Sequence, residues 1–311
     1  MDLESLDTTP LSRTPDRARW RRFRAEAVAG THGADLAGAR WWRQWAYPAA
    51  AVMVVVSMAA MPVALLAAEG AGVRSVTWSA LWCGGVAVVA VTLLGWQRHE
   101  FWGPRARGRL RLVEFARRNG LRYEPEASVP RPAAHIFGSA RRRRHLDRVE
   151  VPGPCGFVLA SYEETWDDGI GESWGYDAGY AVFRLRESYP RTLVGRAMPV
   201  RVKALQDVEP IDGPAGTRIW STKAAYPLLG RLLESGVVDR VLELGRSSQV
   251  EIVGDELFVL RGGGHWPTGS PRLWTRMEAI AQALAPFLGP AAADPDDSRA
   301  LLLRRPATGP R

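Results

Sequence analysis

The stretch SYEETWDDGIGESWGYDAGY, residues 161–180, holds the densest set of side chains that could do chemistry. It contains six carboxylates and five aromatic rings, and no lysine or arginine. A calcium loop would need acids at alternate positions, a central glycine and a glutamate closing twelve residues. Asp167, Asp168 and Glu172 do not have that spacing, so we interpret the stretch as the solvated connection of a β-hairpin. Trp166 and Trp174 are its candidate contacts with a partner, because rings exposed on a loop often meet one.

Histidine and cysteine offer few further sites. The five histidines show no H-E-x-x-H motif and no close spacing to a cysteine, and no G-x-S-x-G motif occurs. A nucleophile pair of Cys155 with His265 has no supporting motif either. Gly264 and Gly269 are spaced as in a phosphate-binding loop, but Ser270 stands where that motif needs lysine. We therefore expect no catalytic residue, no metal ligand and no cofactor.

Two uncharged apolar runs precede these residues, 22 residues at 47–68 and 19 residues at 78–96. As helices rising about 1.5 Å per residue, each would reach roughly 30 Å, the thickness of a bilayer core. The sequence therefore predicts a two-helix transmembrane hairpin over 47–96, an anchor rather than a cleaved signal. Arginines flank its outer ends, so the positive-inside rule places both termini in the cytoplasm at the plasma membrane.

Arginines are concentrated next to these runs. Residues 97–150 carry a net charge of +8, whereas 151–311 carry −2. Four consecutive arginines are typical of nucleic-acid contacts, but lipid headgroups would be the nearest polyanion to a membrane segment. Nucleic acid is therefore not the expected partner, and a solvated turn is the alternative. The candidate contacts with anionic lipid headgroups are Arg105, Arg107, Arg109, Arg111, Arg141, Arg142, Arg143 and Arg144.

The elements that must position these residues follow from composition. Residues 1–46 are expected to be a basic, partly disordered segment containing either an interfacial helix or a frayed tail. Residues 97–289 are expected to form a cytoplasmic α+β domain, because many short β-type segments alternate with turns between helical patterns. We predict an antiparallel sheet packed with helices. Residues 290–311 are expected to be a disordered tail.

Specific strand pairs are expected within this sheet. Residues 156–162 and 180–186 would pair as a hairpin with a long connection at 163–179. Residues 249–253 and 256–261 would form a second hairpin, because Gly254 and Asp255 between them suit a two-residue turn. Residues 135–139 are expected to form a further short strand.

Several short patterns carry a family resemblance: FARRNGLRY at 115–123, IFG at 136–138, GFV at 156–158 and IVGDEL at 252–257. With them, the region from about 110 to 288 resembles the soluble domain of uncharacterised bacterial two-span membrane proteins. The resemblance implies the extent of the domain. It brings no activity and no site residues.

These observations favour a membrane-anchored cytoplasmic interaction or regulatory module, with the lipid bilayer and a protein as partners. One alternative is a membrane-associated, hydrolase-like enzyme built around His265, Cys155 or the acids Asp167, Asp168 and Glu172. Another is a structural subunit of a larger membrane complex, in which small residues in the two apolar runs would pack between helices.

Overall fold

A computed structural model describes residues 6–32, 56, 84–85, 88, 92, 104–128, 132–138, 142–167, 173–196, 208–213 and 216–289. The chain divides into two compact units. One comprises Arg13–Leu112, and the other comprises Met1–Ser12 together with Val113–Arg311.

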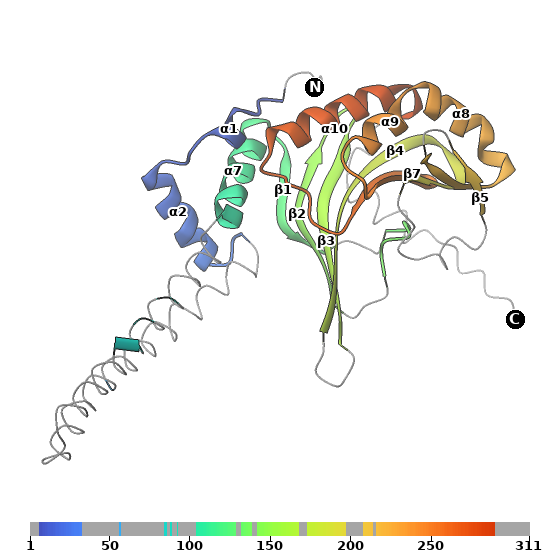
Figure 1. The fold of residues 1–311 in the computed structure, drawn as a ribbon. Coiled ribbons are helices and arrows are strands. Elements are labelled where there is room, and N and C mark those ends of the chain that lie inside the picture. Colours follow the sequence, from blue (N-terminus) through green and yellow to red (C-terminus); the bar gives the residue numbers. More distant parts are fainter. Residues whose placement is uncertain are drawn as a thin grey trace, which may run out of the picture. The chain divides into compact units, whose positions relative to one another are not determined.

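The second unit is built on an antiparallel sheet whose central strand is β4 (Figure 1). β4 pairs with β3 and then β6 along one side and with β7 along the other. β1 and β2 extend the sheet beyond β3, and β5 extends it beyond β6. The strands are β1 (Arg122–Ala127), β2 (Arg142–Val151), β3 (Phe157–Asp167), β4 (Ser173–Gly195), β5 (Glu209–Asp212), β6 (Arg218–Ser221) and β7 (Ser248–Gly262).

Helices cover one face of this sheet (Figure 1). They are α8 (Tyr226–Glu234), α9 (Val237–Leu242) and α10 (Pro271–Leu284). α10 begins with proline, and its buried side chains recur at helical spacing, which gives the helix one apolar stripe to pack. Gly236 between α8 and α9 is left-handed, with φ of 70°, so one continuous helical pattern becomes two helices.

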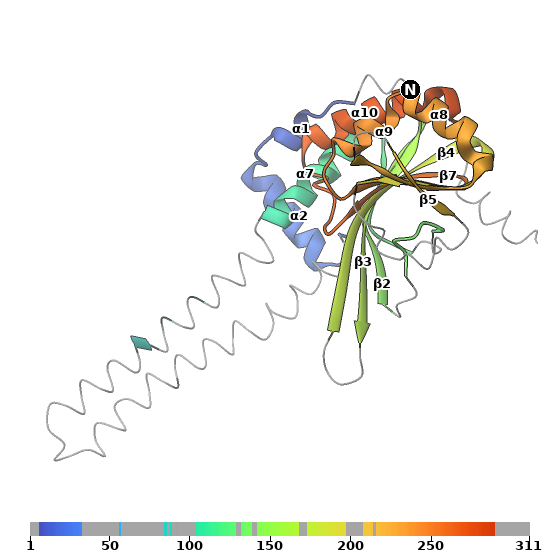
Figure 2. The same cartoon turned by 45° about the vertical axis from the view of Figure 1, so that its right-hand side comes forward.

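The segment 132–138, between β1 and β2, lies on the opposite face from these helices (Figure 2). Ala134, Ile136 and Phe137 are buried there against side chains of β3, β4 and β7. Successive residues of a strand point to opposite faces, so strands covered on both sides need apolar residues throughout. The apolar content of β3 and β7 has this cause.

Three local expectations change. Residues 135–136 form a turn and 137–138 have no regular structure, so the strand expected from 135 is absent there. The hairpin of β3 and β4 is present, but its strands continue to Asp167 and from Ser173, so most of the expected loop is strand. The turn at Gly254 is absent, because β7 stays paired with β4 on both sides of it. Register shifts beside Tyr189 absorb the left-handed Gly254 as an irregularity within one long strand.

The predicted two-helix transmembrane hairpin is wrong, since no helix in the described part of the chain is both long and apolar enough to cross a membrane. The helices before the sheet, α1 (Thr9–Ser12), α2 (Arg17–Val28) and α7 (Pro104–Arg118), have 4, 12 and 15 residues. A span needs about 20 mostly apolar residues, and α7 contains six arginines.

The assignment as a two-span plasma-membrane protein with cytoplasmic termini is corrected by the same finding. The runs at 47–68 and 78–96 themselves lie outside the described residues, apart from the isolated helical positions Val56, Gly84, Gly85, Val88 and Thr92. The expected tail at 290–311 also lies outside them.

Candidate functional site

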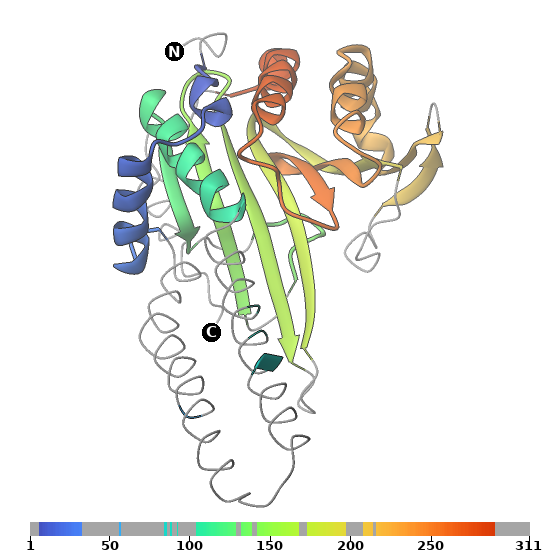
Figure 3. The ribbon, with the colours of Figure 1, turned by 60° about the vertical axis from the view of Figure 1, so that its left-hand side comes forward.

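β3 and β4 continue beyond the rest of the sheet as a β-arm, formed by residues 163–167 and 173–177 (Figure 3). β2 accompanies β3 as far as Thr165, so one side of the arm is covered. On the other side, β7 pairs with β4 only from Ala178 onward. Among the described residues, no strand pairs with this outer edge of β4 before Ala178.

A histidine and two carboxylates meet at the base of the β-arm. Glu163 of β3 and Asp177 of β4 are directly opposite each other in the strand register. His265, from the loop after β7, places Nε2 3.2 Å from Glu163 Oε1 and 3.9 Å from Asp177 Oδ1. Glu163 and His265 are half-buried, whereas Asp177 is exposed. This His265 cluster can hold a cation or transfer a proton.

The loop that carries His265 is fixed on both sides. Gly263 and Gly264 have positive φ and donate both backbone N–H groups to the Asp177 carbonyl, each at 3.1 Å. Trp266 N–H donates to Ser161 Oγ at 3.2 Å. The glycine-rich sequence therefore ends β7, and its backbone N–H groups are hydrogen-bonded to β4. In a phosphate-binding loop, such N–H groups would instead be available to the ligand.

Trp266 also lies against the backbone of Gly179, where an added Cβ would come within 2.7 Å of the indole ring. Arg261 lies over the same ring and donates to the His265 carbonyl at 3.3 Å. The backbone on both sides of His265 therefore has a defined position.

The structure does not bring together the residues considered for the alternative, hydrolase-like site. Cys155 lies in the turn before β3, whereas His265 lies beside Glu163, toward the other end of that strand. Six residues separate Phe157 from Glu163, or roughly 20 Å at about 3.3 Å per residue. Asp167 is the last residue of β3. Asp168 and Glu172 lie outside the described residues.

The two tryptophans expected to contact a partner are cross-strand neighbours in the β-arm. Trp166 is half-buried, and the side chain of Trp174 is outside the described part of the chain. Cross-strand aromatic pairs stabilise an antiparallel ribbon. Their role in binding stays a prediction.

The arginines expected at lipid headgroups differ in their surroundings. Arg109 is buried and donates to the His32 carbonyl at 3.0 Å, within the unit Arg13–Leu112. Arg144 forms a bidentate pair with Glu126 at 3.0 and 3.2 Å. Arg107 and Arg143 are exposed and Arg111 is half-buried, whereas the side chains of Arg105, Arg141 and Arg142 are outside the described residues.

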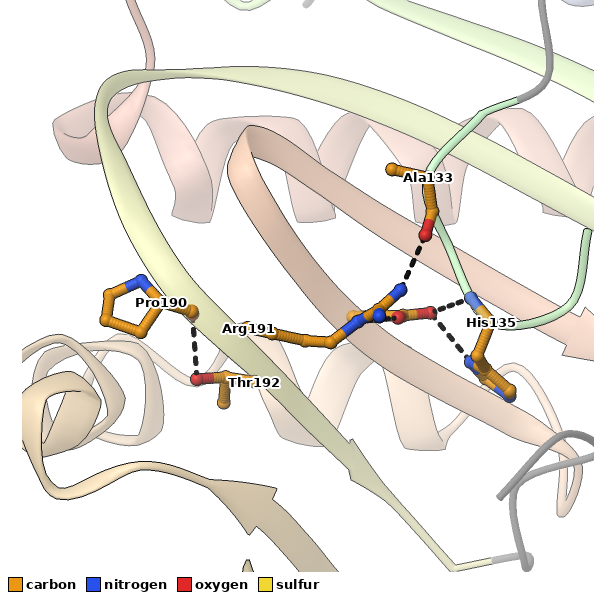
Figure 4. A network of polar contacts seen from close by, with 6 residues as sticks. Ala133, His135, Pro190, Arg191 and Thr192 are labelled. Carbon is orange, nitrogen blue, oxygen red and sulfur yellow. Dashed lines mark hydrogen bonds and ion pairs between the residues drawn. The ribbon is translucent and has the colours of Figure 1, made fainter. Parts of the chain in front are cut away.

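A buried polar network was missed by sequence reasoning (Figure 4). The Glu251 carboxylate is fully buried in β7, and its Oε2 accepts from His135 N–H at 2.8 Å and from His135 Nδ1 at 2.6 Å. Its Oε1 accepts from Arg191 Nε at 3.0 Å, and Arg191 also donates to the Ala133 carbonyl at 2.6 Å. One carboxylate therefore fixes the segment 132–138 to β4 and β7.

A second buried carboxylate fixes the other end of this segment. Glu164 Oε2 accepts from Gly138 N–H at 3.1 Å and from Tyr162 Oη at 2.7 Å. We call Glu164 and Glu251 the clamp carboxylates. Glu251 could have been noticed in the sequence as a single charge within the apolar strand pattern QVEIV. Nothing in the sequence indicated its partners, which are 116 and 60 positions away.

His145 and Tyr180 form a buried pair whose rings both lie near that of Phe137. Burial, and then the charges of Arg143 and Arg148, lower the pKa of His145 to about 4. Burial raises the pKa of Tyr180 well above its usual range, so its hydroxyl keeps the proton. Neutral His145 Nδ1 and the protonated Tyr180 hydroxyl therefore share a hydrogen bond across 2.8 Å.

No family model and no curated protein matches this sequence. Among solved structures, the chain is similar to the mycobacterial trehalose monomycolate transport factor A, TtfA. The likeness has a TM-score of 0.38 and 12% identity, and it covers 60% of this chain and 97% of that one. It is too weak to support an inference about this protein.

Proposed function

We propose that the domain is a protein-interaction module that accepts an extended segment of a partner at the outer edge of β4 in the β-arm. The observation that carries the proposal is the direction of the β4 backbone. The Asp177 carbonyl points away from β3, because it accepts from the loop after β7. Backbone directions alternate along a strand, so the N–H and C=O of Gly175 also point outward.

An open strand edge binds extended peptides by adding a strand, and main-chain hydrogen bonds supply the affinity. A partner strand at Gly175 would continue the line of β7, which turns away at the left-handed Gly263 and Gly264. Gly175 is exposed, and an added Cβ there would meet nothing within 4 Å. This part of the edge is therefore accessible.

The charge of the β-arm selects the chemistry of the partner. Residues 161–180 carry six carboxylates and no basic side chain. Glu164 among them is buried, and the arginines of β2 lie along the covered side of the arm, beside β3 and not at the outer edge of β4. A basic extended segment complements that charge, which speeds encounter and sets specificity. Trp166 and Trp174 would add contact area, since tryptophan is enriched among the residues that dominate binding energy.

A labelled peptide that alternates arginine with valine provides a direct test by fluorescence anisotropy. We expect the full-length protein to bind it, and Gly175→Pro to weaken binding about fivefold or more. Proline removes one outward N–H, worth about 1 kcal/mol, and places its ring on the edge. Proline is tolerated in an edge strand whose N–H faces outward, so the arm should stay folded.

Gly175→Ala is the matched control, because alanine keeps the N–H and its Cβ enters open space. It should bind like the wild type. A peptide methylated on alternate amides keeps the charge but cannot pair, and it should not bind. Equal binding by Gly175→Pro, or by the methylated peptide, would show that charge alone attracts the peptide and would contradict strand addition.

A further inference from the structure

The geometry points to a second site at the base of the β-arm: we propose that Glu163, Asp177 and His265 bind a divalent transition-metal ion such as Zn²⁺. Each residue offers one ligand atom, and the three atoms lie within 4.8 Å of one another. They come from β3, β4 and the loop after β7, so the site exists only in the folded chain. This inference does not depend on strand addition at Gly175.

The histidine nitrogen lies close to both carboxylates. His265 Nε2 is 3.2 Å from Glu163 Oε1 and 3.9 Å from Asp177 Oδ1. The same nitrogen is buried, yet it makes no hydrogen bond of acceptable geometry. Ligands at about 2.0–2.2 Å from tetrahedral zinc lie about 3.4 Å apart. The two distances bracket that value, so small side-chain rotations would close the coordination shell.

Electrostatics at this position favours a cation. Like charges directly opposite each other destabilise an antiparallel pair, and Glu163 faces Asp177 in register. Arg144 Nη1 lies 3.7 Å from Glu163 Oε2 and offsets part of this repulsion. That contact leaves Oε1 directed at His265. Asp177 is 54% exposed, which gives an ion a path from solvent and room for a water ligand.

The ligand set decides the class of ion. Calcium and magnesium are bound by oxygen ligands, whereas an imidazole nitrogen suits zinc, nickel and copper. The His265 loop is already held by hydrogen bonds to Asp177 and Ser161, so little order has to be gained on binding. A bound ion would join this loop to both strands of the β-arm.

Isothermal titration of the full-length, chelator-treated protein with ZnCl₂ tests the site. We expect one saturable Zn²⁺ per chain at this cluster and no comparable binding of Mg²⁺. His265→Ala and Asp177→Asn should each weaken Zn²⁺ binding by about tenfold or more, since even supporting residues of metal sites contribute 10–100-fold. Asp177→Asn changes an exposed side chain and should leave the fold intact.

Asp255→Asn is the control, because this exposed carboxylate pairs with Arg184 elsewhere on the sheet. It should bind Zn²⁺ like the wild type. Zn²⁺ should also raise the unfolding midpoint of the wild type and of Asp255→Asn, but not of His265→Ala. Absence of Zn²⁺ binding by the wild type, or undiminished binding by both cluster variants, would reduce the cluster to a histidine–carboxylate ion pair.

Discussion

At the scale of residues, this domain keeps several ionisable groups inside its sheet, and each has a specific partner. Glu251 and Glu164 are buried, but each accepts at least two hydrogen bonds. His145 is buried in its neutral form and hydrogen-bonded to the Tyr180 hydroxyl. A buried charge or polar group is tolerated only with such partners. For His145, burial in the neutral form makes stability depend on pH.

His145 gives the clearest pH dependence. Its pKa is lowered from 6.5 to about 4 in the folded protein. Between these values the unfolded chain takes up a proton that the folded chain does not, so the free energy of unfolding falls as pH falls. Above pH 6.5 both states are neutral at this residue and it contributes no pH dependence. The loss across the window is about 3 kcal/mol.

His145→Gln removes this titration while keeping a polar side chain. Urea unfolding at a series of pH values should show a decline between pH 6.5 and 4 that is smaller in the variant by about 3 kcal/mol. A constant offset between the two proteins reflects packing at the substituted side chain. Parallel curves throughout the window would show that His145 is not held neutral by the fold.

At the scale of elements, the clamp carboxylates replace secondary structure for the segment 132–138. That segment has no strand partner in the described structure, yet its own side chains Ala134, Ile136 and Phe137 are buried against the sheet. Side-chain acceptors satisfy its backbone N–H groups at His135 and Gly138. Opening of the segment should therefore depend separately on Glu251 and Glu164.

Amide hydrogen exchange can resolve the two ends. Glu164→Gln should speed exchange at Gly138 by about tenfold, because a neutral acceptor forms a hydrogen bond weaker by about 1.4 kcal/mol. Glu251→Gln should act in the same way at His135. Each variant is the control for the other. If both amides speed up equally in both variants, the segment opens as one unit and the two carboxylates are not independent.

At the scale of the whole molecule, Trp274 joins elements that are far apart in sequence. It is fully buried in α10, its ring lies 4.5 Å from that of Phe115 in α7, and its Nε1 donates to the Thr268 carbonyl at 2.8 Å. The side chain therefore connects the end of α7, the loop after β7 and the helical layer. Such a position should affect global unfolding rather than local opening.

Trp274→Ala should lower the free energy of unfolding by about 3–5 kcal/mol, because it leaves a large cavity and an unsatisfied carbonyl. Denaturant unfolding followed by circular dichroism measures the change. Thr275→Ala, one residue along on the exposed face of α10, should change stability by less than about 0.5 kcal/mol. A small effect of Trp274→Ala would mean that the helical layer unfolds apart from the sheet.

Local sequence signals determined where those elements begin and end whose formation depends on residues close together in the chain. Pro271 begins α10, Gly236 separates α8 from α9, and left-handed Gly120 follows the end of α7. These features need only backbone dihedrals and apolar periodicity, both of which can be read from a few consecutive residues. The pairing of 157–160 with 180–183 was also predictable from alternation between turns. The predicted transmembrane hairpin was wrong. The length of two uncharged apolar runs was taken as sufficient for spans, but no helix in the described part of the chain is long and apolar enough to cross a membrane.

Tertiary structure alone decided the sites. Gly254 and Asp255 suit a turn locally, but pairing with β4 on both sides makes them part of one strand. Glu163 and Asp177 looked like loop acids until the register placed them opposite each other and beside His265. The partners of Glu251 are set by strand order, which no local pattern encodes. Short-range preferences choose the elements, whereas long-range burial and hydrogen bonding choose which side chains meet.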